Sequence, residues 1–353
     1  MINKKVIFVV ASMAGGGAER VIAILANQFV QQGIEVSIMM TAGEDVVYQL
    51  DRRVELVSIG GKTGGSMKAR FMRIKKMRDY FKVNSPAVAV VFGLGASFFA
   101  VMANVFLKNK MIISERNDPN ACTHPHLRNL IYSRADYMVY QTEMARDEFP
   151  EYLKKRSAVI ANPISSNLPK RWGGKREKKV VAVGRLEKQK NYEMMLKAFA
   201  KFYEKHPEYQ LHIFGKGYLE SSLKKMADSL QISEAVVWEG FSRNVWQQIE
   251  SAAMYILSSD YEGISNSMLE ALGLGLPVIS TDCPIGGSRM CIQNRENGIL
   301  VPVGESQALA QAMCEVVEDE EFAKKIADNA YKIREKFSEE NISGQWLNVI
   351  SRL

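Results

Sequence analysis

Apolar residues follow two alternating patterns along the chain. Short runs rich in Val and Ile, such as residues 5–11 and 87–92, predict buried strands, and the spacing of apolar residues within 19–32 predicts an amphipathic helix. Further strands are predicted at residues 35–40, 54–59, 111–114, 137–141 and 158–161, and a second series at 179–184, 211–215, 236–240, 254–258 and 278–281. Strands that alternate with helices predict α/β domains with parallel sheets covered on both faces.

The two series of strands are separated by a stretch with the composition of a linker. Residues 162–179 contain two prolines, two glycines and a run of Lys and Arg. The length of 353 residues also favours two domains. We therefore expect a domain at 1–165 and another at 166–337, each a doubly wound sheet. Ligands bind at the carboxyl ends of strands in such sheets, so two of them facing each other predict a binding cleft.

One uncharged segment is long enough to cross a membrane. Residues 87–107 carry no charge over 21 positions. However, a β-branched run ends at Phe92, Gly93 and Gly95 follow, and the remainder has the length of a helix, which predicts a buried strand, a turn and a helix instead. Hydrophobic residues make up 47% of the chain and charged residues 24%, as in globular proteins, which excludes a disordered chain or a disulfide scaffold.

The cysteines and the N-terminus both predict a cytoplasmic protein. Cys122, Cys283, Cys291 and Cys314 form no CxxC pair and no zinc spacing, so we expect free thiols in a reducing compartment. The apolar run after Lys5 is too short for the hydrophobic part of a signal peptide.

Glycines cluster where the first predicted strand meets its helix. Residues 15–17 would let backbone N–H groups approach an anion at the helix N-terminus, although a tight turn alone also explains them. They are not a dinucleotide fingerprint, because Arg20 stands at the third glycine position and Thr41 replaces the acidic residue after the second strand. Residues 60–65 resemble the end of a P-loop, but Leu56 stands where that motif requires its first glycine. We therefore expect a flexible loop.

Charged residues gather at two strand ends of the second domain. Arg185 and Lys190 are suited to gripping a diphosphate, although two solvated surface cations are the commoner outcome for an isolated pair. Glu262 follows a later strand and Glu270 stands after seven intervening residues, one to two turns into the next helix, so both are able to face one cleft. The alternative is that Glu262 caps this helix and Glu270 is solvated, which the apolar neighbours of Glu270 weaken.

Together these segments resemble the retaining family 4 glycosyltransferases with the GT-B fold. Glu262 and Glu270 match the E-x7-E signature of that family. The glycine loop 15–20, Arg185 with Lys190, and the segments 271–277, 286–287 and 297–302 resemble its other motifs in the same order. The resemblance runs from about residue 6 to the C-terminus, so it implies two Rossmann-like domains across a cleft, with the last helix, 338–353, packing back on the first domain.

The resemblance also implies what the residues do. A UDP-sugar donor is expected on the second domain, with the residue at Glu270 on the ribose hydroxyls and the one at Glu262 at the transferred hexose or N-acetylhexosamine. Arg185 and Lys190 would hold the diphosphate, Asn266 would contact the donor, and Gly16 and Gly17 would close over it. In the family, configuration is retained by same-side transfer, in which the leaving phosphate helps to deprotonate the acceptor hydroxyl.

No metal or other cofactor is expected. Negative charge develops on the leaving diphosphate, and a cation must stabilise it. No two aspartates stand two residues apart as in a D-x-D metal site. The most similar segment runs from Asp260 to Glu262, but Glu262 is already assigned to the transferred sugar. Arg185, Lys190 and helix N-termini are then the available positive groups, which predicts a metal-independent reaction.

The loop after the strand at 111–114 departs from many relatives, which have a histidine there. This chain has Glu115, Arg116, Asn117 and Asp118, similar to the S-E-R-N sequence of some polysaccharide-assembling members. We expect Arg116 to grip the phosphate or sugar of the donor and Asn117 or Asp118 to bind a sugar hydroxyl, and we assign Arg116 and Asp118 as catalytic. A helix-capping loop with Arg116 paired to a carboxylate explains the loop equally well.

The positive charge is concentrated in the first domain. Residues 1–165 contain 22 Lys and Arg against 14 Asp and Glu, while the whole chain has a net charge of +7. Many of the cations lie in one predicted helix at 67–83, namely Lys68, Arg70, Arg73, Lys75, Lys76 and Arg78. The helix either lies on anionic lipid or packs its apolar face on the sheet with a solvated basic rim. The first option predicts a peripheral protein of the inner membrane face with a polyprenyl-diphosphate-linked glycan acceptor, in bacterial surface polysaccharide assembly.

Two other functional classes fit part of the pattern. A nucleotide-sugar epimerase shares the two-domain fold, but the E-x7-E segment favours transfer. A basic nucleic-acid-binding or membrane-binding protein would use the same helix, but neither interleaved aromatics nor a nucleic-acid-binding motif is present, so no nucleic-acid partner is expected.

Overall fold

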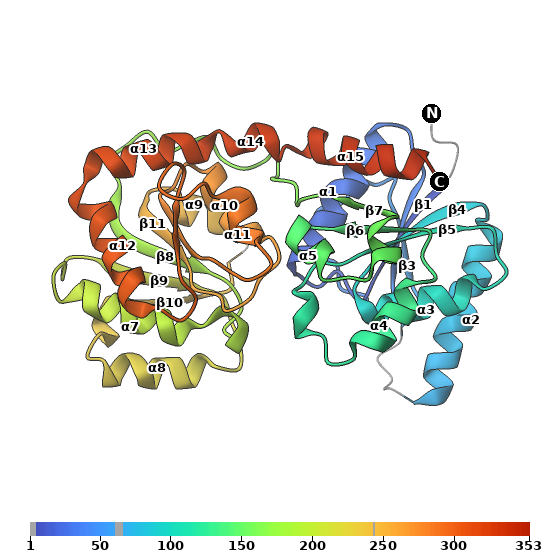
Figure 1. Ribbon diagram of the computed structural model, residues 1–353, viewed down its shortest axis with the longest axis horizontal. Helices are drawn as coiled ribbons and strands as arrows, with labels where there is room; N and C mark the ends of the chain where they lie inside the picture. Colours follow the sequence, from blue (N-terminus) through green and yellow to red (C-terminus); the bar gives the residue numbers. More distant parts are fainter. Residues whose placement is uncertain (1–4, 61–65, 243) are drawn as a thin grey trace. The chain divides into compact units, whose positions relative to one another are not determined.

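The computed structural model describes residues 5–60, 66–242 and 244–353, so residues 61–65 of the expected glycine-rich loop lie outside the described ranges. The chain divides into two compact units (Figure 1). Unit 1 comprises residues 1–163 and 338–353, and unit 2 comprises residues 164–337. The stretch predicted as a linker is largely part of unit 2, because Arg334 donates hydrogen bonds of 2.8 Å to the carbonyls of Leu168 and Pro169.

Unit 1 contains a seven-stranded sheet in the order β3-β2-β1-β4-β5-β6-β7. Its strands are β1 (Lys5–Val10), β2 (Val36–Met40), β3 (Glu55–Ser58), β4 (Ala87–Phe92), β5 (Lys110–Ser114), β6 (Tyr137–Tyr140) and β7 (Ser157–Val159). All neighbouring strands are parallel, and the central strands β1 and β4 are almost entirely buried, as their unbroken apolar runs predicted.

Helices cover both faces of this sheet. They are α1 (Gly17–Gln31), α2 (Met67–Val83), α3 (Leu94–Asn104), α4 (Pro125–Tyr132), α5 (Glu143–Asp147), α6 (Glu151–Lys154) and α15 (Glu339–Ser351). Side chains of α2, α3 and α4 form one core with the sheet, while α1 and α15 lie beside each other on the opposite face (Figure 1). There Phe29 of α1 stacks on Phe8, and Trp346 of α15 stacks on Phe92 with ring centroids 6.0 Å apart.

The uncharged segment 87–107 forms β4 and α3, as the glycine turn between them predicted. Across the described residues, no helix combines the length and apolar character that crossing a bilayer requires.

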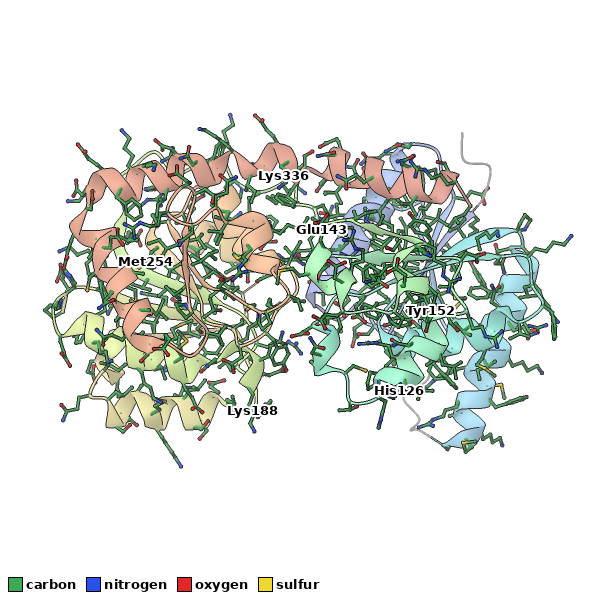
Figure 2. All side chains as sticks on the ribbon, in the orientation of Figure 1. His126, Glu143, Tyr152, Lys188, Met254 and Lys336 are labelled. Carbon is green, nitrogen blue, oxygen red and sulfur yellow. The ribbon has the colours of Figure 1, made fainter. Side chains whose placement is uncertain are left out.

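Unit 2 contains a six-stranded parallel sheet in the order β10-β9-β8-β11-β12-β13. Its strands are β8 (Glu177–Val183), β9 (Gln210–Phe214), β10 (Val236–Gly240), β11 (Ala252–Leu257), β12 (Val278–Thr281) and β13 (Ile299–Val301). The sequence pattern missed β13. Met254 of β11 has no exposed surface and lies among the side chains that fill the interior of unit 2 (Figure 2).

The helices of unit 2 also lie on both faces of its sheet. They are α7 (Tyr192–Tyr203), α8 (Glu220–Ser229), α9 (Val245–Ile249), α10 (Asn266–Gly273), α11 (Gly287–Cys291), α12 (Ser306–Glu318), α13 (Glu320–Tyr331) and α14 (Ile333–Lys336). Side chains of α7, α8 and α12 share one core with alternate residues of β8, such as Val180 and Ala182. This alternation leaves Val181 for the opposite face.

Both sheets have a point at which the strand order reverses. In unit 1 it lies between β1 and β4, and in unit 2 between β8 and β11. Ligands of doubly wound sheets bind at the carboxyl ends of strands at this point. The loops that follow β8 and β11 are therefore the first place to look for a site in unit 2.

Candidate active site

The loops after β8 and β11 bring Lys190 and Glu262 together. Lys190 Nζ lies 2.5 Å from Glu262 Oε2, and the two side chains are only 12% and 15% exposed. Ser259 Oγ donates a second hydrogen bond, of 3.1 Å, to the same carboxylate oxygen. The structure thus places a cation and a carboxylate, separated by 72 residues in sequence, at the switch point of the sheet.

Further hydrogen bonds hold the loops after β8 and β11 in place relative to each other. Asn191 Nδ2 donates to Asp260 Oδ1 over 2.6 Å, and the Asp260 N–H donates to the Gln189 carbonyl over 2.9 Å. Ser258 Oγ donates to the carbonyl of Lys190 itself, over 2.7 Å. The sequence interpretation missed these partners, and the only signal for them is the density of polar residues directly after each buried strand.

The helix α10 carries Glu270 into the interior of unit 2. Ser265 caps α10 by accepting a hydrogen bond from the Met268 N–H, so the alternative in which Glu262 is the cap is wrong. Glu270 is only 4% exposed, which also excludes a solvated helix residue. Asn266, the other predicted donor contact on this helix, is its first residue.

Two hydrogen-bonded hydroxyl groups connect α10 to the sheet. Tyr255 of β11 donates to Ser267 Oγ over 2.8 Å, and Ser267 Oγ donates to the Val183 carbonyl, at the end of β8, over 3.0 Å. Burial raises the pKa of the Tyr255 hydroxyl strongly, so it stays protonated as a donor at neutral pH. These hydrogen bonds fix the start of α10 relative to β8 and β11, whose following loops form the site.

Two close backbone approaches explain glycines beside this site. A Cβ added at Gly287 would overlap the carbonyl oxygen of Gly263, the residue after Glu262. A Cβ added at Gly215 would overlap the carbonyl oxygen of Gly184, which precedes Arg185. Glycine is required at Gly287 and Gly215 because backbone from a neighbouring loop occupies the space of a side chain.

Arg185 is not part of the Lys190 and Glu262 contact. Its side chain is 67% exposed, and its guanidinium pairs with Glu187 at 3.2 Å on the same loop. The diphosphate-binding role of Arg185 stays a prediction.

The glycine loop of unit 1 lies at the switch point of its own sheet. Gly16 is the N-cap of α1 and Gly17 its first residue. Tyr48 donates a hydrogen bond of 2.8 Å to the Gly16 carbonyl, and Gly15 has φ = +114°, a conformation that favours glycine. The predicted approach of Gly16 and Gly17 to an anion is compatible with this helix N-terminus and stays a prediction.

Arg116 packs inside unit 1 rather than pairing with a carboxylate. Its guanidinium lies 4.9 Å from the ring centroid of Phe92 and 5.5 Å from that of Trp346. Nη1 donates to Asn162 Oδ1 over 2.9 Å, while Nε and Nη2 have no hydrogen-bond partner in the described part of the chain. Burial lowers the pKa of Arg116 to about 9. The predicted alternative, an ion pair between Arg116 and a carboxylate, is therefore wrong. The side-chain hydrogen-bond partner of Arg116 is the amide of Asn162.

Asp118 has a local structural role. Its Oδ1 accepts a hydrogen bond of 2.8 Å from the Asn120 N–H and caps the short 3-10 turn Pro119–Ala121. Packing and capping account for Arg116 and Asp118 respectively, and the catalytic assignment of both stays a prediction.

The basic helix at 67–83 forms as predicted, but its faces differ from expectation. Within α2, which the structure describes completely, only Met77 and Phe81 are buried, and Phe71 is 69% exposed. Arg78 donates hydrogen bonds to the carbonyls of Ala103 and Val105, so it is not part of a solvated rim. The guanidinium of Arg73 also turns to α3, over the ring of Phe99. The other four cations of the predicted surface are exposed, namely Lys68, Arg70, Lys75 and Lys76.

Comparison with known proteins shows what unit 2 is similar to. The model of the family described as glycosyl transferases group 1 matches residues 166–333, which contain Lys190, Glu262 and Glu270. This match covers just under half of the chain. Together with relatives that match over the full length, it shows that the protein is a glycosyltransferase and therefore an enzyme.

Relatives and solved structures extend the likeness to the whole chain. The chain is 28% identical, over 99% of both sequences, to the GalNAc-alpha-(1->4)-GalNAc-alpha-(1->3)-diNAcBac-PP-undecaprenol alpha-1,4-N-acetyl-D-galactosaminyltransferase of Campylobacter jejuni. The lipopolysaccharide outer core galactosyltransferase WaaB superposes with a TM-score of 0.76 over 99% of this chain and 100% of its own, at 22% identity. Anabaena HepE in complex with UDP and glucose gives a TM-score of 0.86 over 99% and 100% of the two chains, at 18% identity. These matches confirm the predicted GT-B fold.

Proposed function

We propose that the protein transfers a hexose or N-acetylhexosamine from a UDP-sugar, with retention of configuration, to a polyprenyl-diphosphate-linked glycan during assembly of bacterial surface polysaccharide or glycan. The observation that carries the proposal is the mostly buried ion pair of Lys190 and Glu262 at the switch point of a glycosyl transferases group 1 domain. The family 4 resemblance supplies the retaining stereochemistry.

The ion pair suits a donor that brings its own negative charge. Before the donor binds, Glu262 balances the charge of Lys190 and holds Nζ in place. A diphosphate then offers Lys190 a second anion, so Glu262 is able to turn toward the transferred sugar. Glu270, buried on α10, takes the ribose hydroxyls. The structure of HepE with UDP and glucose supports UDP as the nucleotide.

In the proposed reaction the bond between the anomeric carbon and the leaving phosphate oxygen breaks, and a bond to the acceptor oxygen forms on the same side. The acceptor proton passes to the leaving phosphate. Lys190, with Arg185 once the donor binds, stabilises the charge that develops on the diphosphate. We propose that these cations replace a metal ion in this role.

Donor binding and metal independence are tested together with a panel of UDP-sugars. One of them is expected to protect the protein against thermal unfolding by about 2.7 kcal/mol at a hundredfold excess over Kd. The same UDP-sugar is expected to release UDP slowly without acceptor, at equal rates with and without a chelator. Measuring UDP and free sugar separates transfer from epimerisation, because an epimerase changes the sugar without releasing UDP. Loss of activity with chelator while the protein stays folded, and its return with a divalent ion, would contradict the metal-free step.

The proposed acceptor brings unit 1 to a membrane surface. The exposed apolar side chains Met67 and Phe71 on α2, Phe98 and Met102 on α3, and Leu130 on α4 belong to three helices of the same face of the sheet. Four exposed cations of α2 accompany them. Exposed apolar and basic residues together suit the surface of an anionic bilayer. The name of the Campylobacter relative, which includes an undecaprenol-linked diphosphate, supports an acceptor of this kind at the inner face of the cell membrane.

Vesicle binding tests the membrane surface. The protein is expected to bind vesicles that contain anionic lipid at low salt and to dissociate at high salt. Each basic residue near such a surface contributes about 1 kcal/mol, so a variant that combines K68E, R70E, K75E and K76E should bind at least about a hundredfold more weakly. A matched variant that reverses four exposed lysines of unit 2, namely Lys197, Lys224, Lys225 and Lys324, is expected to bind like the wild type. Absence of wild-type binding at low salt would refute the membrane surface without affecting the donor site.

A further inference from the structure

A histidine, a cysteine and a glutamate meet where α7 and α12 end. His206 follows the last turn of α7, and Cys314 and Glu318 lie in the last two turns of α12. Cys314 and Glu318 are four residues apart, so they face the same side of their helix. The two helices pack together in the core of unit 2 through side chains such as Phe202 and Met313. Packing of the helices therefore brings the three side chains together.

The donor atoms of this cluster are close to one another. His206 Nε2 lies 3.0 Å from Glu318 Oε1, and these atoms and Cys314 Sγ all lie within 4.8 Å of each other. In a tetrahedral zinc site with bonds of about 2.0–2.3 Å, ligand atoms stand roughly 3–4 Å apart. The longest separation in the cluster is up to 4.8 Å, so metal binding requires its ligand atoms to move closer by up to about 1 Å.

Packing already orients the imidazole. The ring of His206 stacks on Phe202 with centroids 5.0 Å apart, and Tyr209 meets its edge at 6.2 Å. His206 is 18% exposed and Glu318 55% exposed at the side chain, whereas Cys314 is buried. The cluster therefore has one buried ligand, one oriented ligand and one side open to water.

The charges around the cluster nearly balance. Lys201, Lys205, Glu315 and Asp319 line the same cavity, of about 380 Å³, together with Cys314 and Glu318. Lys201 is occupied by a 2.7 Å hydrogen bond to Gln307, and Glu315 pairs with Arg295. A dication that meets one thiolate and one carboxylate is neutralised by its own ligands.

We propose that His206, Cys314 and Glu318 bind Zn²⁺, with water as the fourth ligand. Thiolate, imidazole and carboxylate are the ligands that zinc takes in proteins, and three protein ligands with one water form a common tetrahedral set. None of the three residues belongs to the contact of Lys190 with Glu262, so the proposal is independent of the proposed function. The ion would connect the ends of two helices whose ligands lie up to 112 residues apart in sequence.

Metal titration of chelator-stripped, tag-free protein tests the site. Co²⁺ is expected to bind with one ion per chain and to give the charge-transfer absorption of a thiolate ligand, and Zn²⁺ is expected to displace it. The C314S variant should lose this absorption, and H206Q should bind at least about tenfold more weakly. The C122S variant removes a partly exposed cysteine of unit 1 and should behave like the wild type.

Thermal unfolding gives a second readout. Zn²⁺ is expected to raise the Tm of the wild type and of C122S, because it binds the folded state, and to raise that of H206Q less at the same concentration. His206 is partly exposed, so H206Q is expected to fold even if C314S does not. Failure of the wild type to bind Co²⁺ or Zn²⁺ at micromolar concentrations would overturn the proposal, as would unchanged binding by H206Q. Either result leaves the UDP-sugar assay unaffected.

Discussion

Replacing Glu262 by Gln is expected to lower turnover by about 10²–10³-fold while the enzyme remains folded. Glu262 lies against Lys190, in the position where the proposed donor would present its diphosphate and sugar. Gln keeps an oxygen that accepts hydrogen bonds from Lys190 Nζ and Ser259 Oγ. The loss of folding stability should therefore be smaller than the ~3–5 kcal/mol that leaving a buried charge unpaired costs. The measurement is the rate of UDP release, with the Tm of each variant recorded beside it.

A second Lys–Glu pair in unit 2 provides the control. Glu220 pairs with Lys224 at 2.7 Å along the exposed side of α8. E220Q is expected to leave turnover unchanged and to alter stability by at most about 0.5 kcal/mol, because exposed pairs contribute little.

The double variant K190M/E262Q tests whether the pair acts as a unit. Two residues that act together lose activity in a non-additive way, so the double variant should lose little more than the worse of the two single variants. Wild-type turnover in E262Q would exclude a catalytic role for Glu262, whatever the effect on stability.

Replacing Trp346 by Ala is expected to destabilise unit 1 by about 3–5 kcal/mol. Trp346 has no exposed surface, stacks on Phe92 and covers the guanidinium of Arg116. Its removal opens a cavity between α15 and the sheet and uncovers a charge that aromatic rings now enclose. At about 2–4 °C for each kcal/mol in a unit of this size, the transition of unit 1 should fall by about 10 °C.

Calorimetry is the appropriate measurement, because a chain of two units need not unfold in one step. The control is W172A in unit 2, since Trp172 is 39% exposed and its loss should cost less than about 1 kcal/mol. If W346A unfolds like the wild type, the packing of α15 on unit 1 contributes little to stability.

Strong local patterns allowed much of the fold to be predicted. The run of apolar residues at 87–92 and the glycines after it were sufficient to predict β4 and α3 instead of a membrane span. The strand β13 was missed because it has three residues, too few to show a period, and its pairing with β12 defines it. Local sequence predicts such short strands unreliably, since β7 also has three residues and was predicted at 158–161.

The surface of α2 shows where periodicity alone misleads. The helical spacing of Phe71, Ile74, Met77, Tyr80 and Phe81 predicted a single apolar face, but the buried residues of α2 are Met77 and Phe81, both in its C-terminal half. Phe71 therefore stays exposed, while Arg78, expected at the rim, caps carbonyls at the end of α3. Periodicity gives the direction of a side chain from its helix axis, but the neighbouring elements decide whether anything lies there.

By itself the sequence determined the two parallel α/β sheets, most of their strands, the loops that carry Lys190 and Glu262, and the helix that carries Glu270. Only the tertiary structure decided that Lys190 pairs with Glu262, that Arg116 lies between Phe92 and Trp346, and that His206 meets Cys314 and Glu318. The physical reason is the same in each case. Secondary structure follows from neighbours within a few positions, whereas these contacts bring together segments that lie 24 or more positions apart and that only the packing of helices and strands joins.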